Sequence, residues 1–183
     1  MKNSIKMFTV AALLIAGNIS LNAQKVVMVG GAAMSPTKNI VENAMNSKDH
    51  TTLVAAVKAA GLADALQAKG PLTVFAPTNS AFDKLPAGTV DNLVKPENKE
   101  KLTSILTYHV VAGKYDSAAL KEKAKANEGV VVLKTLNGEK ITIMEKDGKW
   151  LVKDSTGNTA QITIADVYQS NGVINVIDTV LMP

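Results

Sequence analysis

The stretch that most constrains the fold is Gly70–Phe82, which places a turn, a strand, a proline stop and a helix start in one short run. Its segment Leu72–Phe75 is rich in β-branched and aromatic residues, which is typical of a core strand. Pro77 has no backbone N–H, so strand pairing cannot continue through it. Thr78 or Asn79 can then cap the free N–H groups of a following helix. The stretch therefore predicts a strand and a helix joined at a fixed angle, and it does not by itself indicate a reaction or a ligand.

The rest of the first half of the chain is rich in helix signals. Apolar residues recur at helical spacing, and capping residues, glycines and prolines mark the ends. The expected helices are 39–46, a helix capped by Asp49 and ended by Gly61, 62–67, 89–94, a helix opened by Pro96 that carries His109, and 118–126 capped by Ser117.

The second half changes to the alternating pattern of strands. Asn-Gly and Asp-Gly pairs separate the runs, and such pairs supply the positive φ angles of tight hairpin turns. The expected strands are 130–136, 139–146, 150–153, 160–167 and 173–181. Helices segregated from an antiparallel sheet make this an α+β domain. We also expect Gly70–Phe82 to pack against the C-terminal run 171–183.

The first 23 residues predict a secretory signal peptide. Lys2 and Lys6 precede a short apolar run, and Ala23 stands at the expected cleavage site. The run is shorter than the roughly 20 residues that a membrane span needs, so we expect no stable span after removal of the signal. Residues 24–38 are a lead-in segment without a sustained period, and residues 39–183 form the domain. The expected location is extracytoplasmic, either secreted or periplasmic.

Composition narrows the classes of partner. The chain has no cysteine and no arginine, and after loss of the signal 18 lysines face 16 acidic residues, a net charge of +2. Arginine is the preferred side chain for recognising phosphates and guanine. A nearly neutral, exported chain without it is not expected to bind nucleic acid.

Catalytic and metal-binding motifs are missing from the sequence. It has no Gly-x-Ser-x-Gly elbow, no His-Glu-x-x-His pair and no phosphate-binding glycine loop, so we expect no enzyme and no cofactor. His50 has no second histidine or cysteine near it in sequence, so we expect no metal site there and place it at the surface. The run 154–158 lacks the glycine and closing glutamate of a calcium loop and is interpreted as a hairpin turn.

Three motifs in order resemble the fasciclin-type domain family. Residues 73–82 (Thr-Val-Phe-Ala-Pro-Thr-Asn-Ser-Ala-Phe) are similar to its first signature motif, and residues 171–183 to its second. Between them, Leu106–Val111 resembles the Tyr-His motif of the family. The resemblance extends from about Asn39 to the C-terminus.

The resemblance implies a β-wedge or sandwich with helices packed against a mainly antiparallel sheet, in proteins used for adhesion. It also implies partner binding at the Tyr-His motif, Tyr108 and His109, and at an Asp-Ile position that falls here on Asp166 and Val167. Two departures are Val167 itself and Asn175, where the family usually has histidine. If that histidine makes a buried polar contact, Asn175 must replace both its donor and its acceptor.

Two questions stay open at this point. His109 lies on an apolar helix face, where its ring nitrogens could serve buried backbone groups, so we expect substitution of His109 to lower thermal stability and substitution of Tyr108 to weaken adhesion. The expected function is non-covalent binding to a cell-surface or matrix protein or polysaccharide. The alternative is a carrier of an apolar small molecule, a lipid or pigment, in the cell envelope.

Overall fold

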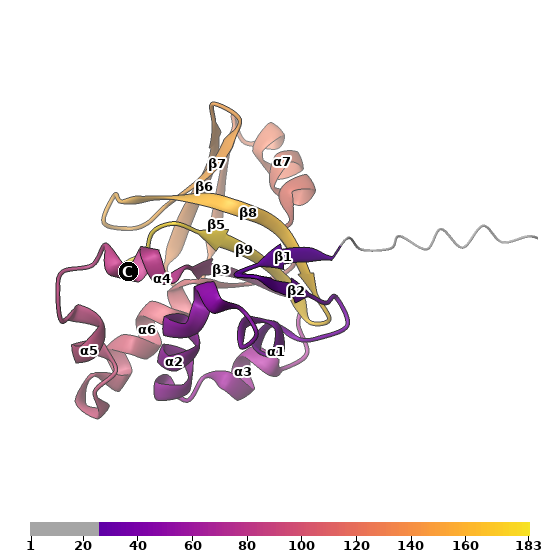
Figure 1. Cartoon of the computed structure of the whole chain (residues 1–183). Coiled ribbons are helices and arrows are strands. Elements are labelled where there is room, and N and C mark those ends of the chain that lie inside the picture. The colour runs from indigo at the N-terminus through magenta and orange to yellow at the C-terminus, as the bar shows by residue number, and fades with distance from the viewer. Residues whose placement is uncertain (1–25) are drawn as a thin grey trace, which may run out of the picture.

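The computed structural model describes residues 26–183, and the expected signal peptide lies outside the described residues. These residues form a seven-stranded sheet, a separate two-stranded hairpin and a layer of helices (Figure 1). The strands are β1 (Val27–Val29), β2 (Ala32–Met34), β3 (Leu72–Pro77), β4 (Val110–Ala112), β5 (Val130–Lys134), β6 (Lys140–Lys146), β7 (Lys149–Lys153), β8 (Thr159–Gln169) and β9 (Gly172–Ile177). Within residues 26–183, no helix has the length and apolar character needed to cross a bilayer.

Most of the helices come from the first half of the chain, as expected. They are α1 (Ile40–Ala44), α2 (Thr51–Ala60), α3 (Ala63–Gln67), α4 (Asn79–Asp83), α5 (Thr89–Leu93), α6 (Lys99–Tyr108) and α7 (Ser117–Ala126), with 3-10 turns η1 (Lys48–His50) and η2 (Pro96–Asn98). In Figure 1, α1 to α6 gather below the sheet, and α7 lies apart from them beside the hairpin of β6 and β7. The expected α+β class, with helices packed against a mainly antiparallel sheet, is confirmed.

The centre of the sheet joins the two motifs that the sequence singled out. The strand order is β4-β3-β9-β8-β7-β6-β5, and β3 runs parallel to β9 while the other neighbours are antiparallel. The parallel register extends from Leu72 opposite Gly172 to Pro77 opposite Ile177. The prediction that the segments Gly70–Phe82 and 171–183 pack together is confirmed.

Both faces of this central pair are buried, which explains why its strands are continuous apolar runs. Side chains alternate between faces along a strand. Val74 and Ile174 point into a core shared with the helices, whereas Phe75 and Ile177 point into a second core. A strand buried on both faces loses the apolar–polar alternation of a surface strand.

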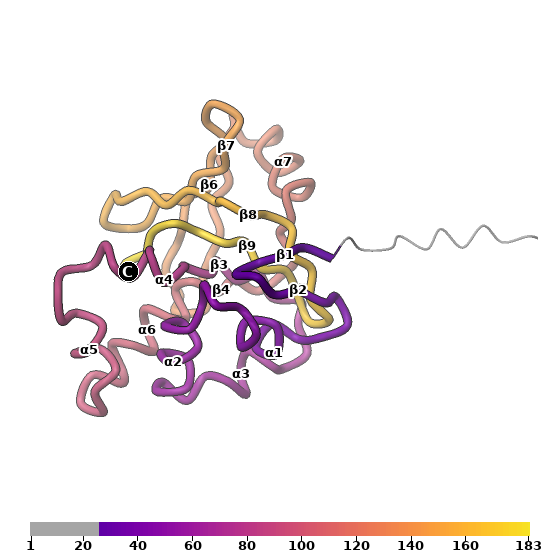
Figure 2. Tube along the Cα trace, viewed as in Figure 1, coloured from indigo at the N-terminus to yellow at the C-terminus, as the bar shows by residue number. Residues whose placement is uncertain are grey.

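The second core lies inside the fold of the sheet itself. The β5–β8 part of the sheet curves over β3 and β9, and α7 packs with it through Leu120 and Ala124. The two edge strands of the sheet, β4 and β5, come close together. Val111 of β4 forms a β-bridge with Thr135, just after β5, and the Leu136 N–H donates to Val110 O at 2.8 Å. Figure 2 shows the chain trace of this curved sheet above the helices. The wedge is therefore nearly closed.

Three local features differ from the sequence expectations. The described part of the lead-in segment forms the β1–β2 hairpin, whose Val29 and Met34 are buried in the helix-side core. The strand β4 was not foreseen, because three residues directly after a helix carry too little period to be recognised. Pro96 begins the 3-10 turn η2, and α6 begins at Lys99.

The helix caps also come from other residues than expected. Asn79 does not cap its own helix; its Oδ1 instead accepts from the N–H of Thr52 at 3.0 Å, at the start of α2. Asp49, which was expected to cap α2, lies in η1 and makes no capping hydrogen bond. Asp116, and not Ser117, caps α7 by accepting from the Ala119 N–H at 2.9 Å. These exchanges arise because an exposed N–H can be reached by a side chain from a neighbouring element as well as from its own.

We predict that Gly172→Ala lowers the free energy of unfolding by about 2 kcal/mol or more. A Cβ atom at Gly172 would overlap the carbonyl group of Leu72 across the β3–β9 pair, and backbone cannot move aside as a side chain can. The control is Gly148→Ala, where a Cβ meets open space and only the φ of +72° is unfavourable, at a cost of about 1 kcal/mol. Urea unfolding of the three proteins gives both values; equal losses in the two variants would contradict the close approach.

Candidate functional site

Tyr108 is fully buried at the C-terminal end of α6, with no exposed surface. Its hydroxyl donates to Lys140 O at 3.0 Å and accepts from the Ser155 N–H at 2.9 Å. Burial raises the pKa of Tyr108, so the hydroxyl keeps its proton as a donor. The side chain thus joins α6 to the start of β6 and to the turn between β7 and β8, and it does not present a contact surface to a partner.

His109 is also inside the protein, 3% exposed. Its Nδ1 lies 2.8 Å from Ile105 O, and its Nε2 accepts from the Leu181 N–H at 3.0 Å. This pairing requires the neutral tautomer with the proton on Nδ1. Burial lowers the pKa of His109 to about 4, although the Ile105 carbonyl opposes the shift. The ring is buried and its nitrogens meet backbone groups, as expected for a structural histidine, and it connects α6 to the C-terminal segment.

Asp166 and Val167 lie at an irregularity of the sheet. The register between β8 and β9 shifts between Ile164 and Val167, so that β8 carries an extra residue. Val167 points into the helix-side core and is 1% exposed. Asp166 has a φ of +60° and is partly exposed. The two residues that the resemblance pairs therefore face different environments, and only Asp166 can touch a partner directly.

Asn175 sits opposite this irregularity and is fully buried. Its Oδ1 accepts from the Asp166 N–H at 3.2 Å, and its Nδ2 donates to Tyr115 O at 3.2 Å. The amide therefore supplies one acceptor and one donor to backbone groups that the sheet does not pair. This matches the expectation that asparagine takes over both functions of a buried histidine.

The Asp166 carboxylate belongs to a polar cluster that contains the loop before α7. Its Oδ1 accepts from the Ser117 N–H at 2.6 Å. Tyr168 donates from its hydroxyl to Asp116 Oδ2 at 3.2 Å, and Lys114 Nζ lies 4.5 Å from the centre of the Tyr168 ring. Burial, followed by the charges of Asp116 and Asp166, raises the pKa of Tyr168 to about 12. The cluster holds a cation, an aromatic ring and two carboxylates at the surface.

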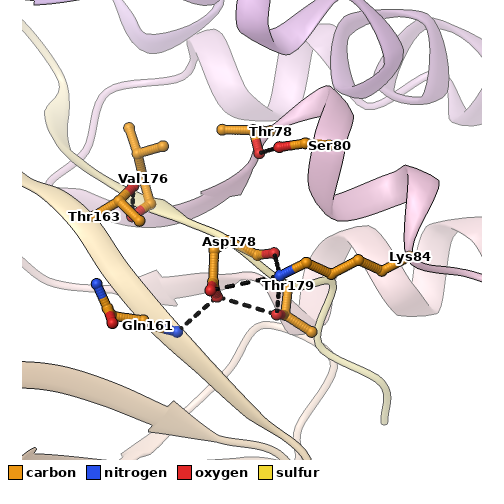
Figure 3. A network of polar contacts seen from close by, with 8 residues as sticks. All are labelled: Thr78, Ser80, Lys84, Gln161, Thr163, Val176, Asp178 and Thr179. Atoms are coloured by element: carbon orange, nitrogen blue, oxygen red, sulfur yellow. Dashed lines mark hydrogen bonds and ion pairs between the residues drawn. The ribbon is translucent and has the colours of Figure 1, made fainter.

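A second polar network joins the two signature motifs at the opposite end of β9. Figure 3 shows Lys84, just after α4, reaching to Asp178 and Thr179. Lys84 Nζ lies 3.5 Å from Asp178 Oδ2 and donates to Asp178 O, while Asp178 Oδ1 accepts from the Gln161 N–H at 2.8 Å. Burial alone would raise the pKa of Asp178, but the Gln161 N–H, the Thr179 hydroxyl and Lys84 together lower it. The carboxylate is satisfied by neighbouring groups, which gives it a structural role.

His50 corrects a sequence expectation. It was placed at the surface but is 3% exposed, beneath the β1–β2 hairpin, with Nδ1 2.9 Å from Ser47 Oγ. Its Nε2 meets no partner at hydrogen-bond geometry among the described residues, and burial lowers its pKa. The lead-in hairpin covers this side chain, and the paired glycines Gly30 and Gly31 that form its turn are the signal that could have indicated it.

Two recesses differ in chemistry. A cavity of about 40 Å³ lies between the helices and β3, β4 and β9, and aliphatic side chains form most of its wall. A groove of about 720 Å³ opens at the start of β3 and β9, and we call it the polar groove. It is lined by Pro36, Asn39, Gln67, Lys69, Gly70, Pro71, Lys114, Gln169, Ser170, Asn171 and Gly172.

The polar groove has a hydrogen-bonded floor and a rim of exposed side chains. Asn171 in the floor accepts from the Ile40 N–H at 3.0 Å and donates to Leu66 O at 2.8 Å, so its amide is fully used. Gln67, Lys69 and Lys114 at the rim are exposed. The lining contains two lysines and no carboxylate, which suits an anionic or hydroxyl-rich group. Lys114 also belongs to the Asp166 cluster, so groove and cluster form one continuous surface.

The two histidines and the turn at 154–158 are held in structural environments. Both histidines are buried with the described residues packed around them, so neither ring is placed to exchange protons with a substrate at the surface. Residues 154–158 form a turn in which Asp154 Oδ1 accepts from the N–H groups of Thr156 at 3.0 Å and Asn158 at 2.9 Å, as the hairpin interpretation expects. In the described part of the chain, no group of three acidic, histidine or cysteine side chains is arranged to hold a metal ion.

Comparisons with known proteins agree on the type of domain. The sequence model of the fasciclin domain matches residues 48–183. Protein sll1483 of Synechocystis sp. is 50% identical over 160 residues, which cover 87% of this chain and 82% of that protein. The cell surface glycolipoprotein MPB83 of Mycobacterium bovis is 35% identical over 160 residues, 85% of this chain and 64% of that protein.

A solved structure carries the same fold. A FAS1 domain pair from the insect cell adhesion molecule Fasciclin I aligns with a TM-score of 0.70 over 80% of this chain and 51% of that one. The sequence identity is 20%, so this similarity concerns the fold alone.

We predict that stability falls with acidity through His109. Its pKa is lowered from 6.5 to about 4 in the folded state, so the unfolded chain takes up the proton first. Stability is fully present above pH 6.5 and declines toward pH 4, by about 3 kcal/mol in total. In His109→Gln this titration is absent, and His50 contributes equally to both proteins. The difference in free energy of unfolding between wild type and variant should therefore shrink as pH falls, and a pH-independent difference would show that His109 is not held neutral.

We predict that Asn175→Leu costs about 2 to 4 kcal/mol of stability. The variant leaves the Asp166 N–H and the Tyr115 carbonyl without a partner in a buried place. Thr163→Val is the control, because exposed Thr163 makes only a long, part-buried hydrogen bond to Val176 O on the same pair of strands, and its loss should cost within about 0.5 kcal/mol (Figure 3). Chemical unfolding compares the two; a loss in Asn175→Leu no larger than in the control would exclude the proposed pairing.

Proposed function

Because the chain belongs to the fasciclin domain family, we propose that it is an extracytoplasmic interaction module that binds a cell-surface or matrix component without covalent chemistry. The component is a protein or a polysaccharide. The binding surface that we propose is the polar groove together with Asp166 at its border. The observation that carries the proposal is the groove itself: about 720 Å³ of polar recess with Lys69 and Lys114 at the rim.

Relatives support the class of function. One matched protein is named a cell surface glycolipoprotein, and the matched structure comes from a cell adhesion molecule. For this chain, a location outside the cytoplasm rests on the expected signal peptide, and binding rests on the groove. The expected removal of residues 1–23 and the domain bounds 39–183 belong to the same proposal.

The four site residues suggested by the family contribute in different ways under this proposal. Asp166 contacts the partner. Tyr108, His109 and Val167 act through the scaffold, because each is buried and ties α6, β8 or the C-terminal segment in place. Loss of Tyr108 or His109 would therefore weaken binding only by way of stability.

The alternative function, transport of an apolar small molecule, has less support. Ligand pockets enclose about 300–1,000 Å³, whereas the apolar cavity between the helices and the sheet has about 40 Å³. A lipid or pigment would require the core to open. We therefore propose binding at the surface and not carriage in the interior.

We predict that Lys69→Glu/Lys114→Glu reduces adhesion of protein-coated beads to envelope material from the producing cells, by about tenfold or more, because two cations at the rim become anions. The matched control is Lys95→Glu/Lys101→Glu, which makes the same change of charge on exposed residues that do not line the groove. Unchanged adhesion of the groove variant, or an equal loss in the control, would contradict the proposal.

A further inference from the structure

The outward face of the β5–β8 sheet has an unusual composition. Along these strands every second side chain, including Val131, Ile141, Ile143 and Val152, is buried in the second core. The alternate positions point to the other side. On β5, β6 and β7 they are Val130, Val132, Lys134, Lys140, Thr142, Met144, Lys146, Lys149, Leu151 and Lys153, which we call the basic face.

The strand register arranges the basic face in rows. Val130, Met144 and Leu151 lie side by side and form an apolar row across three strands. On one side of it Lys146 is paired with Lys149, near the β6–β7 turn. On the other side lie the row of Val132, Thr142 and Lys153 and then the pair of Lys134 and Lys140. Lysines thus border an apolar strip on both sides.

The charge of this face is entirely positive. Glu139 and Glu145, the carboxylates nearest in sequence, occupy positions of the opposite parity, and Asp147 lies in the turn. Within residues 26–183 the only ion pair is that of Lys84 with Asp178, so none of the five lysines is paired with a carboxylate. Two of the cross-strand pairs place lysine opposite lysine, an arrangement that destabilises a sheet.

Nothing from the described chain packs over this face. The helix α7 shares the second core with Val131 and Leu133, and therefore lies on the inner side of β5 (Figure 1). On the outer side Val132 remains 55% exposed and Val130 36% exposed. The face is thus an open surface of the folded domain.

The shape of the basic face favours a linear polyanion. A lysine carries its charge at the end of a long flexible stem, whereas valine ends close to the sheet. The apolar strip therefore forms the floor of a shallow trough whose two sides are cationic. A bilayer would require the apolar groups to project beyond the charges, which these short side chains on a sheet do not do.

We propose that the basic face is a binding site for an anionic polysaccharide, a linear chain of sugars bearing carboxylate or sulfate groups. The acidic groups pair with lysines on the two sides, and the sugar rings lie on the apolar floor. This site shares no residue with the polar groove, so a test of one does not decide the other. It would give the protein a second point of attachment to a matrix.

The experiment measures binding of the mature protein to polygalacturonate, which carries carboxylates, to dextran sulfate, which carries sulfates, and to neutral dextran. We expect binding to at least one polyanion, weakening steeply with added salt because counterions are released, and no binding to dextran. The variant Lys134→Glu/Lys140→Glu should bind the polyanion at least about tenfold more weakly than the wild type does. Lys121→Glu/Lys125→Glu, on exposed positions of α7, makes the same charge change elsewhere and should bind as the wild type does.

Several outcomes would overturn the proposal. Equal losses in the two charge variants would mean that the protein responds to polyanions by net charge alone. Absence of salt-dependent binding to both polyanions would exclude the site. Binding to phosphatidylglycerol vesicles in preference to both polyanions, with a loss in Val132→Thr, would assign the face to a membrane instead.

A single substitution separates a loss of binding from a loss of folding. The single change Lys140→Glu converts a like-charge pair with Lys134 into an opposite-charge pair, so it should keep or raise the melting temperature. A loss of polyanion binding at unchanged or higher melting temperature would therefore come from the face and not from unfolding.

Discussion

The parallel pairing of β3 with β9 is the interaction on which the rest of the structure depends. It brings together two segments about a hundred residues apart in sequence, and the entropy of closing so long a loop must be repaid by what the pair buries. Both faces of the pair are covered, one by the helices and the other by the curved β5–β8 sheet. The close approach at Gly172 and the network of Lys84 and Asp178 secure the two ends of β9.

Buried polar groups around this pair act as connectors between elements. Tyr108 joins α6 to the sheet, His109 joins α6 to the C-terminal segment, and Asn175 supports the irregular part of β8. Each pairs backbone groups that regular secondary structure leaves open, and an unpaired buried group would cost about 1–3 kcal/mol. The family motifs are therefore mainly structural in this chain, and they leave the outer surfaces free to differ.

We therefore expect binding at outer surfaces whose positions depend on the motifs and whose exposed side chains lie mostly outside them. The polar groove opens where β3 and β9 begin, and Asp166 stands at its border on an irregular strand. The basic face lies on β5, β6 and β7, on the side of these strands opposite α7. The polar groove and the basic face are thus two separate surfaces of one domain, and both are formed by side chains outside its cores.

Much of the fold was readable from local pattern. The hairpin strands and most helices followed from alternation, helical spacing and turn residues, because these signals depend on neighbours in sequence. The site was less readable. Asp166 and Val167 were paired by the resemblance as one site, yet Asp166 is partly exposed and Val167 is buried in the helix-side core, and the register shift beside them has no local sequence signal.

The sequence by itself determined the class of the fold, because apolar periodicity and turn residues express it directly, and its three ordered motifs indicated the family. Only the tertiary structure decided that Asn79 caps α2, that the lead-in hairpin buries His50 and that Tyr108 has no exposed surface. It also gathered five lysines on one face of the sheet. These properties depend on contacts and registers between distant segments, which no local pattern of residues records.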